Sequence, residues 1–138
     1  GEVSTLADLP RPAVRKVALA NPETAPYGLA ARNALERAGL WEVLQPKLVI
    51  AGSVSQALLH VEEGNADAAL VSRSLAGGAT SKVVEIDPTL YPPRIQGLGI
   101  VARSTQKERA RRFVEFLRGE EGRRLLERRG FAPPQPQP

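Results

Sequence analysis

The chain contains no cysteine, and this absence excludes several kinds of chemistry. Without thiols there are no disulfide bonds, no thiolate nucleophile and no cysteine-ligated metal site. A single histidine leaves too few nitrogen ligands for a zinc site, because such sites combine several ligands at a defined spacing. We therefore expect no metal held by side chains. The absence of cysteine does not identify the cellular compartment, because cysteine-free chains occur in both reducing and oxidising compartments.

Methionine, long apolar runs and a catalytic constellation are absent as well. No apolar run approaches the roughly 20 residues that span a bilayer. The first residues show no secretory signal pattern, so we expect the chain to begin after a processing or cleavage site. Glu23 would act as a general base only beside a nucleophile or a metal ligand, and the sequence supplies neither. A binding protein is therefore favoured over an enzyme.

Positive charge is concentrated near the carboxyl end of the chain. The net charge is +4, and residues 103–129 hold ten Lys/Arg against five Asp/Glu. Nucleic-acid binding is one explanation of such a segment. The segment lacks the interleaved aromatic residues on which bases stack, so an arginine-rich, solvated helical face is the favoured explanation. We expect no nucleic-acid partner.

The alternation of apolar runs with helical patterns predicts the fold class. Each of three short apolar runs is typical of a buried strand, and the two segments between them have the periodicity of helices. Strands and helices that alternate in this way form parallel sheets with right-handed crossovers. The predicted strands are 14–20, 47–50 and 67–71, and the predicted helices are 26–38 and the segment between Ser53 and Gly64.

The rest of the chain completes the predicted architecture. Further strands are predicted at 83–86 and 95–102, and further helices at 105–118 and 120–129. We expect an α/β fold: a three-layer lobe with a mixed, mainly parallel sheet flanked by helices, followed by two C-terminal helices. The expected division is 1–104 for the lobe, 105–132 for the C-terminal helices and 133–138 for a disordered tail of proline and glutamine.

Two of the predicted helices begin directly after a predicted strand. Residues 21–28 open the first helix, and residues 51–56 open the second. Ser53 and Gln56 have the spacing of a capping box, so Ser53 is expected to cap the second helix. A helix start carries unpaired N–H groups and the positive end of the helix dipole, and it binds oxyanions without a cationic side chain. The sequence predicts that both starts bind one oxyanion.

Five short motifs resemble, in order and spacing, the second-lobe signature of molybdate-binding proteins of ABC transporters. They extend over nearly the whole chain, and together they are far more specific than any one alone. The motifs are 20–28, 54–58, 64–68, 91–93 and 129–131.

This resemblance implies a two-lobed periplasmic binding fold of type II, with the ligand between the lobes. The chain corresponds to the second lobe and the C-terminal return, and most of the first lobe, with its two serine-bearing loops, has no counterpart. The implied ligand is a tetrahedral oxyanion, molybdate or tungstate, and no cofactor is implied. The implied partner is an ABC permease. The implied location is periplasmic or extracytoplasmic, with the protein either anchored or soluble.

By position, the resemblance maps the oxyanion contacts onto three residues. Tyr27 and Val54 would act through their backbone N–H groups, and Ser72 through its hydroxyl. Many relatives have a tyrosine at the position of Ser72, and a serine reaches less far. Pro26 starts the helix that carries Tyr27 and belongs to the same predicted site.

The predicted site relies on neutral donors. A buried dianion needs many N–H and O–H donors to replace its water. Molybdate and tungstate present only acceptor oxygens near neutral pH, so a site without acceptors also rejects protonated phosphate. Ser53 and Ser55 are local alternatives as donors, although the capping role is favoured for Ser53.

The apolar side chains of the C-terminal helices need burial. Phe113, Val114, Phe116 and Leu117 can fold onto their own lobe, bind a separate first-lobe chain, or form a homodimer through these helices. We expect a dimer or a partner. An alternative function is a ligand-sensing or protein-interaction module derived from the same lobe, which the segment preceding the lobe in the natural gene would distinguish.

Overall fold

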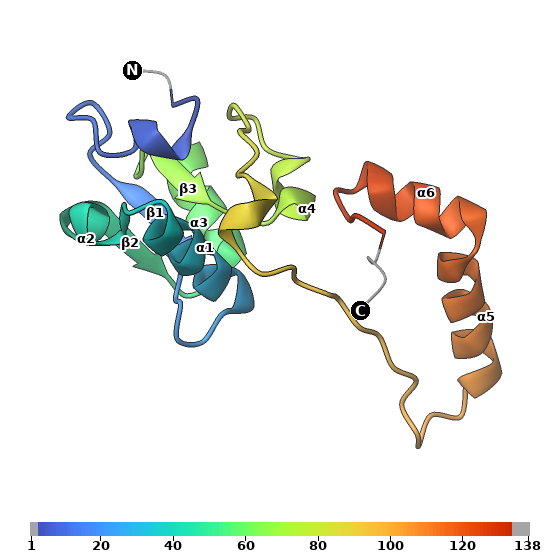
Figure 1. Ribbon diagram of the computed structural model, residues 1–138. Coiled ribbons are helices and arrows are strands. Elements are labelled where there is room, and N and C mark those ends of the chain that lie inside the picture. The colour runs from blue at the N-terminus through green and yellow to red at the C-terminus, as the bar shows by residue number, and fades with distance from the viewer. Residues whose placement is uncertain (1–2, 134–138) are drawn as a thin grey trace. The chain divides into compact units, whose positions relative to one another are not determined.

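Three parallel strands form the sheet of the first part of the chain (Figure 1). The computed structural model describes residues 3–133. The strands are β1 (Val17–Ala20), β2 (Leu48–Ala51) and β3 (Ala68–Leu70). β1 is central, and the strand order is β2-β1-β3. This parallel pairing confirms the predicted α/β lobe.

The chain divides after Pro93 into two compact units. The first unit contains the sheet and the helices η1 (Leu6–Asp8), α1 (Pro26–Arg37), α2 (Trp41–Leu44), η2 (Gln45–Lys47), α3 (Val54–Glu62), α4 (Arg73–Ala76) and η3 (Pro88–Leu90). Gly39 and Gly64 follow α1 and α3 with φ of 70° and 73°, a left-handed conformation that glycine adopts without strain. Both helices therefore end where the glycines predict.

Apolar side chains cover the two faces of the sheet with different packing. On one face, Val17 and Leu19 of β1 pack with Ala31 and Leu35 of α1. On the opposite face, the small residues Ala18 and Ala51 pack with Ala57 of α3, and α3 contacts all three strands. Because successive side chains of a strand point to opposite faces, α1 and α3 lie on opposite sides of the sheet.

Charged side chains bind the backbone where the strands begin. Asp67, just before β3, accepts hydrogen bonds from the backbone N–H groups of Arg15 (2.8 Å) and Lys16 (2.9 Å), just before β1. These two bonds, that of Lys16 first, hold the pKa of Asp67 below its ordinary value. Lys47, just before β2, donates to carbonyl oxygens of residues 9–11, with a shortest contact of 2.7 Å. The amino ends of all three strands are thus held by ionised side chains.

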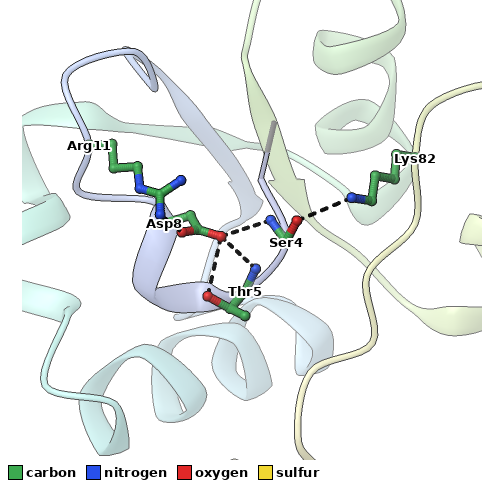
Figure 2. A network of polar contacts seen from close by, with 5 residues as sticks. All are labelled: Ser4, Thr5, Asp8, Arg11 and Lys82. Carbon is green, nitrogen blue, oxygen red and sulfur yellow. Dashed lines mark hydrogen bonds and ion pairs between the residues drawn. The ribbon is translucent and has the colours of Figure 1, made fainter. Parts of the chain in front are cut away.

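A second polar network fixes the segment that leads to β1 (Figure 2). Asp8 in η1 accepts from the backbone N–H groups of Ser4 (2.8 Å) and Thr5 (2.9 Å), and these bonds lower its pKa. Arg11 forms an ion pair with the same carboxylate. Lys82 donates to the hydroxyl of Ser4 at 3.2 Å and so links the segment to a distant part of the first unit.

Two of the predicted strands are wrong. Residues 83–86 and 95–102 form no strand in the described structure. A strand is stable only when a neighbouring strand takes its backbone hydrogen bonds, and neither segment has such a neighbour within residues 3–133. Ile95 and Leu98 are each 59% exposed, so the apolar pattern of the second segment also lacks a covering layer. The sheet of the described residues accordingly has no antiparallel strand.

The second unit consists of α5 (Lys107–Arg118) and α6 (Glu120–Arg128), which pack against each other after a turn at Gly119. Gly122 allows this close approach, because a Cβ there would lie 2.2 Å from the carbonyl oxygen of Phe116. Phe113 is nevertheless 60% exposed and Leu125 37% exposed. The two predicted C-terminal helices are therefore present, and part of their apolar face is uncovered.

Two further predictions concern the carboxyl end of the chain and the absence of a membrane-spanning helix. Most of the predicted disordered tail, 134–138, lies outside the described residues. Within residues 3–133, no helix combines the length and the apolar character that crossing a bilayer demands.

Candidate functional site

The candidate site is the edge of the sheet where the strands end. The chain leaves β1 toward α1 on one face and leaves the adjacent strand β2 toward α3 on the other. In open α/β sheets, ligands bind outside the carboxyl ends of the strands at the point where neighbouring connections separate in this way. The backbone N–H of Asn21 donates to the carbonyl of Ala51 at 2.9 Å and keeps the two connections together up to that point.

Asn21 shapes the loop that precedes α1. Its side-chain oxygen accepts from the N–H of Glu23 at 2.9 Å, and its carbonyl accepts from the N–H of Ala25 at 2.9 Å. Pro26 is the first residue of α1, where a missing N–H costs nothing and the fixed φ suits the helix. The loop therefore turns tightly into α1.

Gly28 brings the first turn of α1 against the end of β1. A Cβ at this position would lie 2.3 Å from the carbonyl oxygen of Ala20 and 2.7 Å from that of Asn21. Only glycine fits there, because both neighbours are backbone atoms. Tyr27, which is half-buried, is therefore placed in a helical turn directly beside the carboxyl end of the central strand.

The start of α3 has the predicted cap with one difference. Ser53 accepts from the N–H of Gln56 at 3.1 Å, which confirms its capping role. The Gln56 side chain accepts from the N–H of Gly52 at 2.8 Å rather than from Ser53, so the reciprocal half of the capping box is displaced by one residue. Among residues 3–133, the N–H groups of Val54 and Ser55 have no acceptor. These two donors are the unpaired first-turn groups of α3.

Ser72 lies at the same edge of the sheet but on the other side of β1. It follows β3, is 6% exposed, and its hydroxyl is 3.1 Å from that of Ser74. Ser72 also precedes the first residue of α4, and α3 contacts both β3 and α4. The structure thus brings the starts of α1 and α3 to adjacent strand ends, with Ser72 one strand further along.

One ion-pair network beside the site was missed by sequence reasoning. Arg32 of α1 donates to Glu36 at 2.8 Å and to Glu23 at 3.3 Å, and its guanidinium lies 5.2 Å from the ring centre of Trp41. The Glu36 bond is the main cause of a raised pKa for Arg32. The Arg32–Glu36 spacing of four residues is readable from sequence. The contact with Glu23 across the loop has no such local signal.

Two hollows of the described structure lie away from this edge of the sheet. One of about 170 Å³ is lined by Glu36, Gly39, Trp41 and Glu42 at the far end of α1, where carboxylates repel an anion. Another follows the surface of α6 alone. Among residues 3–133, no three His, Cys, Asp or Glu side chains are grouped so as to hold a metal ion.

Comparisons with known proteins agree with this architecture. The molybdate-binding protein ModA of Rhodobacter capsulatus is 33% identical over 118 residues, which are 83% of this chain and 46% of the relative. ModA of Azotobacter vinelandii is 33% identical over 132 residues, 91% of this chain and 51% of the relative. The chain spans about half the length of the curated relatives it matches.

A solved structure gives the same result in three dimensions. The periplasmic molybdate-binding protein of Azotobacter vinelandii superimposes with a TM-score of 0.84 at 28% sequence identity, covering 98% of this chain and 62% of that one. Its name describes the binding of molybdate. The family model described as bacterial extracellular solute-binding protein matches residues 1–132, and the chain belongs to this family.

Proposed function

We propose that the chain binds a tetrahedral oxyanion, molybdate or tungstate, as part of the substrate-binding component of an ABC transporter. One observation carries this proposal: α1 and α3 begin at the ends of adjacent strands and lie on opposite faces of the sheet. Two helix starts then share one position outside the sheet, and each adds N–H donors and partial positive charge there. The molybdate-binding relatives support this choice of ligand.

The proposed donors are backbone groups. Val54 and Ser55 supply N–H groups from the first turn of α3, and Tyr27 supplies one from the first turn of α1. Pro26 holds the start of α1 in place, while Ser53 acts as the helix cap. Ser72 contributes a hydroxyl to the proposed site from the end of β3.

Discrimination among oxyanions follows from size and protonation. Molybdate and tungstate have the same shape and charge, so one site accepts both. Sulfate is a smaller dianion, and fixed backbone donors cannot close around it without moving. A protonated phosphate oxygen needs an acceptor, which a site built of donors does not offer.

Calorimetric titration of the 138-residue chain with molybdate, tungstate and sulfate tests the proposal. We expect binding heat with the first two anions and a weaker response to sulfate. Absence of heat with all three contradicts oxyanion binding by this chain. Affinity is expected to be lower than that of a two-lobed relative, since only part of the donor shell lies in this half.

A proline variant removes one donor with little damage to the helix. Val54 is the first residue of α3, where proline is favoured, and Ser53 before it has the extended backbone that proline requires. Val54→Pro is therefore expected to weaken molybdate binding about tenfold or more while leaving the melting temperature nearly unchanged. Glu120→Pro, at the first residue of α6, is the matched control and should leave the affinity unchanged.

The wider setting of the protein is also a proposal. We place the chain as the second lobe of a two-lobed receptor in a periplasmic or extracytoplasmic space, where an ABC permease is its partner. The relatives support this setting because one is named as a periplasmic molybdate-binding protein and the curated ones are about twice as long as this chain.

Apolar side chains that are exposed in the second unit favour the proposal that another polypeptide packs against them. Phe113, Phe116 and Leu125 on α5 and α6 are exposed, as are Ile95 and Leu98 before them. We propose that the first-lobe half, to which this chain has no counterpart, covers them. Without that half, exposed apolar surface of this kind drives self-association.

Light scattering of the 138-residue chain at increasing concentration tests whether these exposed side chains drive self-association. We expect a mass that rises above that of the monomer, and Phe113→Glu is expected to restore the monomer. Arg112→Glu is the control, because it places a glutamate one residue away on an exposed polar position and makes the net charge more negative still. A monomer at every concentration for the unaltered chain contradicts the need for a cover.

A further inference from the structure

An acidic side chain stands in the loop that leads to the proposed oxyanion site. Glu23 is three residues before Pro26, the first residue of α1, and its side chain is 76% exposed. A carboxylate that swings in front of the α1 start would repel a dianion and compete with it for the helix N–H groups. Binding of a dianion at the start of α1 is therefore favoured when the Glu23 carboxylate is held away from it.

Arg32 holds the Glu23 carboxylate away from the start of α1. Its guanidinium donates to the Glu23 carboxylate at 3.3 Å. Arg32 is six residues into α1, which corresponds to about 9 Å along the helix axis from its first residue. A carboxylate bonded there lies alongside the helix rather than in front of its first turn.

Arg32 is itself held in place by two further contacts. Glu36, one turn along α1, accepts from its Nε at 2.8 Å, and the Trp41 ring lies 5.2 Å from the guanidinium. With hydrogen bonds and a cation–π contact, the guanidinium loses most of its freedom to follow Glu23 toward solvent. The Asn21 side chain fixes the backbone N–H of Glu23 at 2.9 Å from the other side.

We infer that Arg32 is a positioning residue for oxyanion binding: it draws the Glu23 carboxylate back along α1 and neutralises it. This inference rests on the proposed function, because the repelled ligand is the proposed oxyanion. Arg32 does not touch the ligand. Its removal acts mainly through Glu23, so the effect of losing Arg32 on binding is smaller when Glu23 has no charge.

The size of the effect follows from electrostatics. A unit charge about 10 Å from a dianion in water changes its binding constant a few-fold at low salt, and a Debye length of about 10 Å at 0.1 M salt removes much of that. We expect Arg32→Gln to weaken molybdate binding about threefold at low ionic strength and to have almost no effect at high salt.

The test is a double-mutant cycle measured by calorimetry at low and high salt on the 138-residue chain. Glu23→Gln alone should bind molybdate at least as tightly as the unaltered chain, and Arg32→Gln should weaken binding less in the Glu23→Gln background than in the unaltered chain, because only the direct attraction between Arg32 and the dianion is then lost. Glu36→Gln is the matched control, since it removes another acidic partner of Arg32 that lies farther from the site. An equal loss of affinity from Arg32→Gln in both backgrounds would show that Arg32 does not act through Glu23 and would overturn the inference.

A second measurement needs no ligand. Trp41 is the only tryptophan of the chain, so its fluorescence reports on the stacked guanidinium. Arg32→Gln should alter this emission and increase the backbone motion of Glu23 in nitrogen relaxation measurements. Unchanged motion of Glu23 overturns the positioning role even when molybdate binds. If molybdate gives no heat with the unaltered chain, the proposed function fails together with the affinity effect, and the relaxation measurement still decides whether Arg32 holds Glu23.

Discussion

The two edges of the sheet are built from the same three strands and differ in how their backbone groups are satisfied. At the edge where the strands begin, Asp67 and Lys47 bind backbone N–H and carbonyl groups directly. At the edge where they end, α3 keeps two unpaired N–H groups among the residues that the structure describes, those of Val54 and Ser55.

The difference suggests that one edge of the sheet contributes mainly to stability and that the other carries the proposed binding site. Charged side chains that neutralise backbone groups at the first edge stabilise the fold and leave nothing for a ligand. At the second edge, Gly28 and Pro26 place the start of α1 close to the end of β1, and the N–H groups of Val54 and Ser55 at the start of α3 have no acceptor among the described residues. Substitutions at the first edge should therefore leave binding unchanged, and substitutions at the second edge should weaken binding when they displace or remove the N–H donors.

The largest expected effect comes from Gly28→Ala at the second edge. The added Cβ would lie 2.3 Å from a backbone oxygen of β1, so α1 must shift as a whole. We expect a loss of about 3 kcal/mol in the free energy of unfolding, measured by urea denaturation, together with loss of molybdate binding. Gly97→Ala is the control, because a Cβ there has open space around it. Equal stability of the two variants would mean that α1 does not rest on β1.

A smaller effect is expected from Asp67→Ala at the first edge. The variant loses two backbone hydrogen bonds, and because the Asp67 side chain is 30% exposed and screened by solvent, we expect a loss of only about 1 kcal/mol near neutral pH. The folded-state pKa of Asp67 is lowered, so this stabilisation is complete above the unfolded-state pKa of about 3.9. It is lost as the pH falls through the lower folded-state value.

Thermal unfolding of both proteins across acidic pH checks this dependence. The difference in stability between them should shrink as the pH falls and should vanish at the acid end. Molybdate affinity of Asp67→Ala should match that of the unaltered chain. A weaker affinity would show that a substitution where the strands begin also affects binding, which contradicts the proposed difference between the two edges.

An effect on stability of similar size is expected from Ser53→Ala, which removes the cap of α3. The loss of one helix cap costs about 1 kcal/mol, measured by urea denaturation. Because Val54 and Ser55 are the proposed donors, molybdate affinity should change by less than about threefold. A fall of tenfold or more would instead identify the Ser53 hydroxyl as a ligand.

The sequence predicted the parts of this lobe that depend on local patterns. Short apolar runs identified β1, β2 and β3, and the glycines at 39 and 64 identified two helix ends, because burial and left-handed backbone leave local signatures. The cap at Ser53 was predicted for the same reason.

Features that depend on distant partners could not be predicted in this way. The apolar run at 95–102 has the pattern of a strand, yet pairing needs a neighbour that the described residues do not contain. Gly28 gave no sign that its lack of a side chain is required by the end of β1. The contact from Arg32 to Glu23 crosses a loop whose path the sequence leaves open.

The most direct test of the account is a titration with molybdate followed by the backbone amide resonances of the nitrogen-labelled chain. We predict that the amides of Val54, Ser55 and Tyr27 shift with one common affinity, while those of Arg15 and Lys16 at the opposite edge stay unchanged. Shifts confined to the basic helices α5 and α6, or to the edge where the strands begin, would contradict an oxyanion site at the two helix starts.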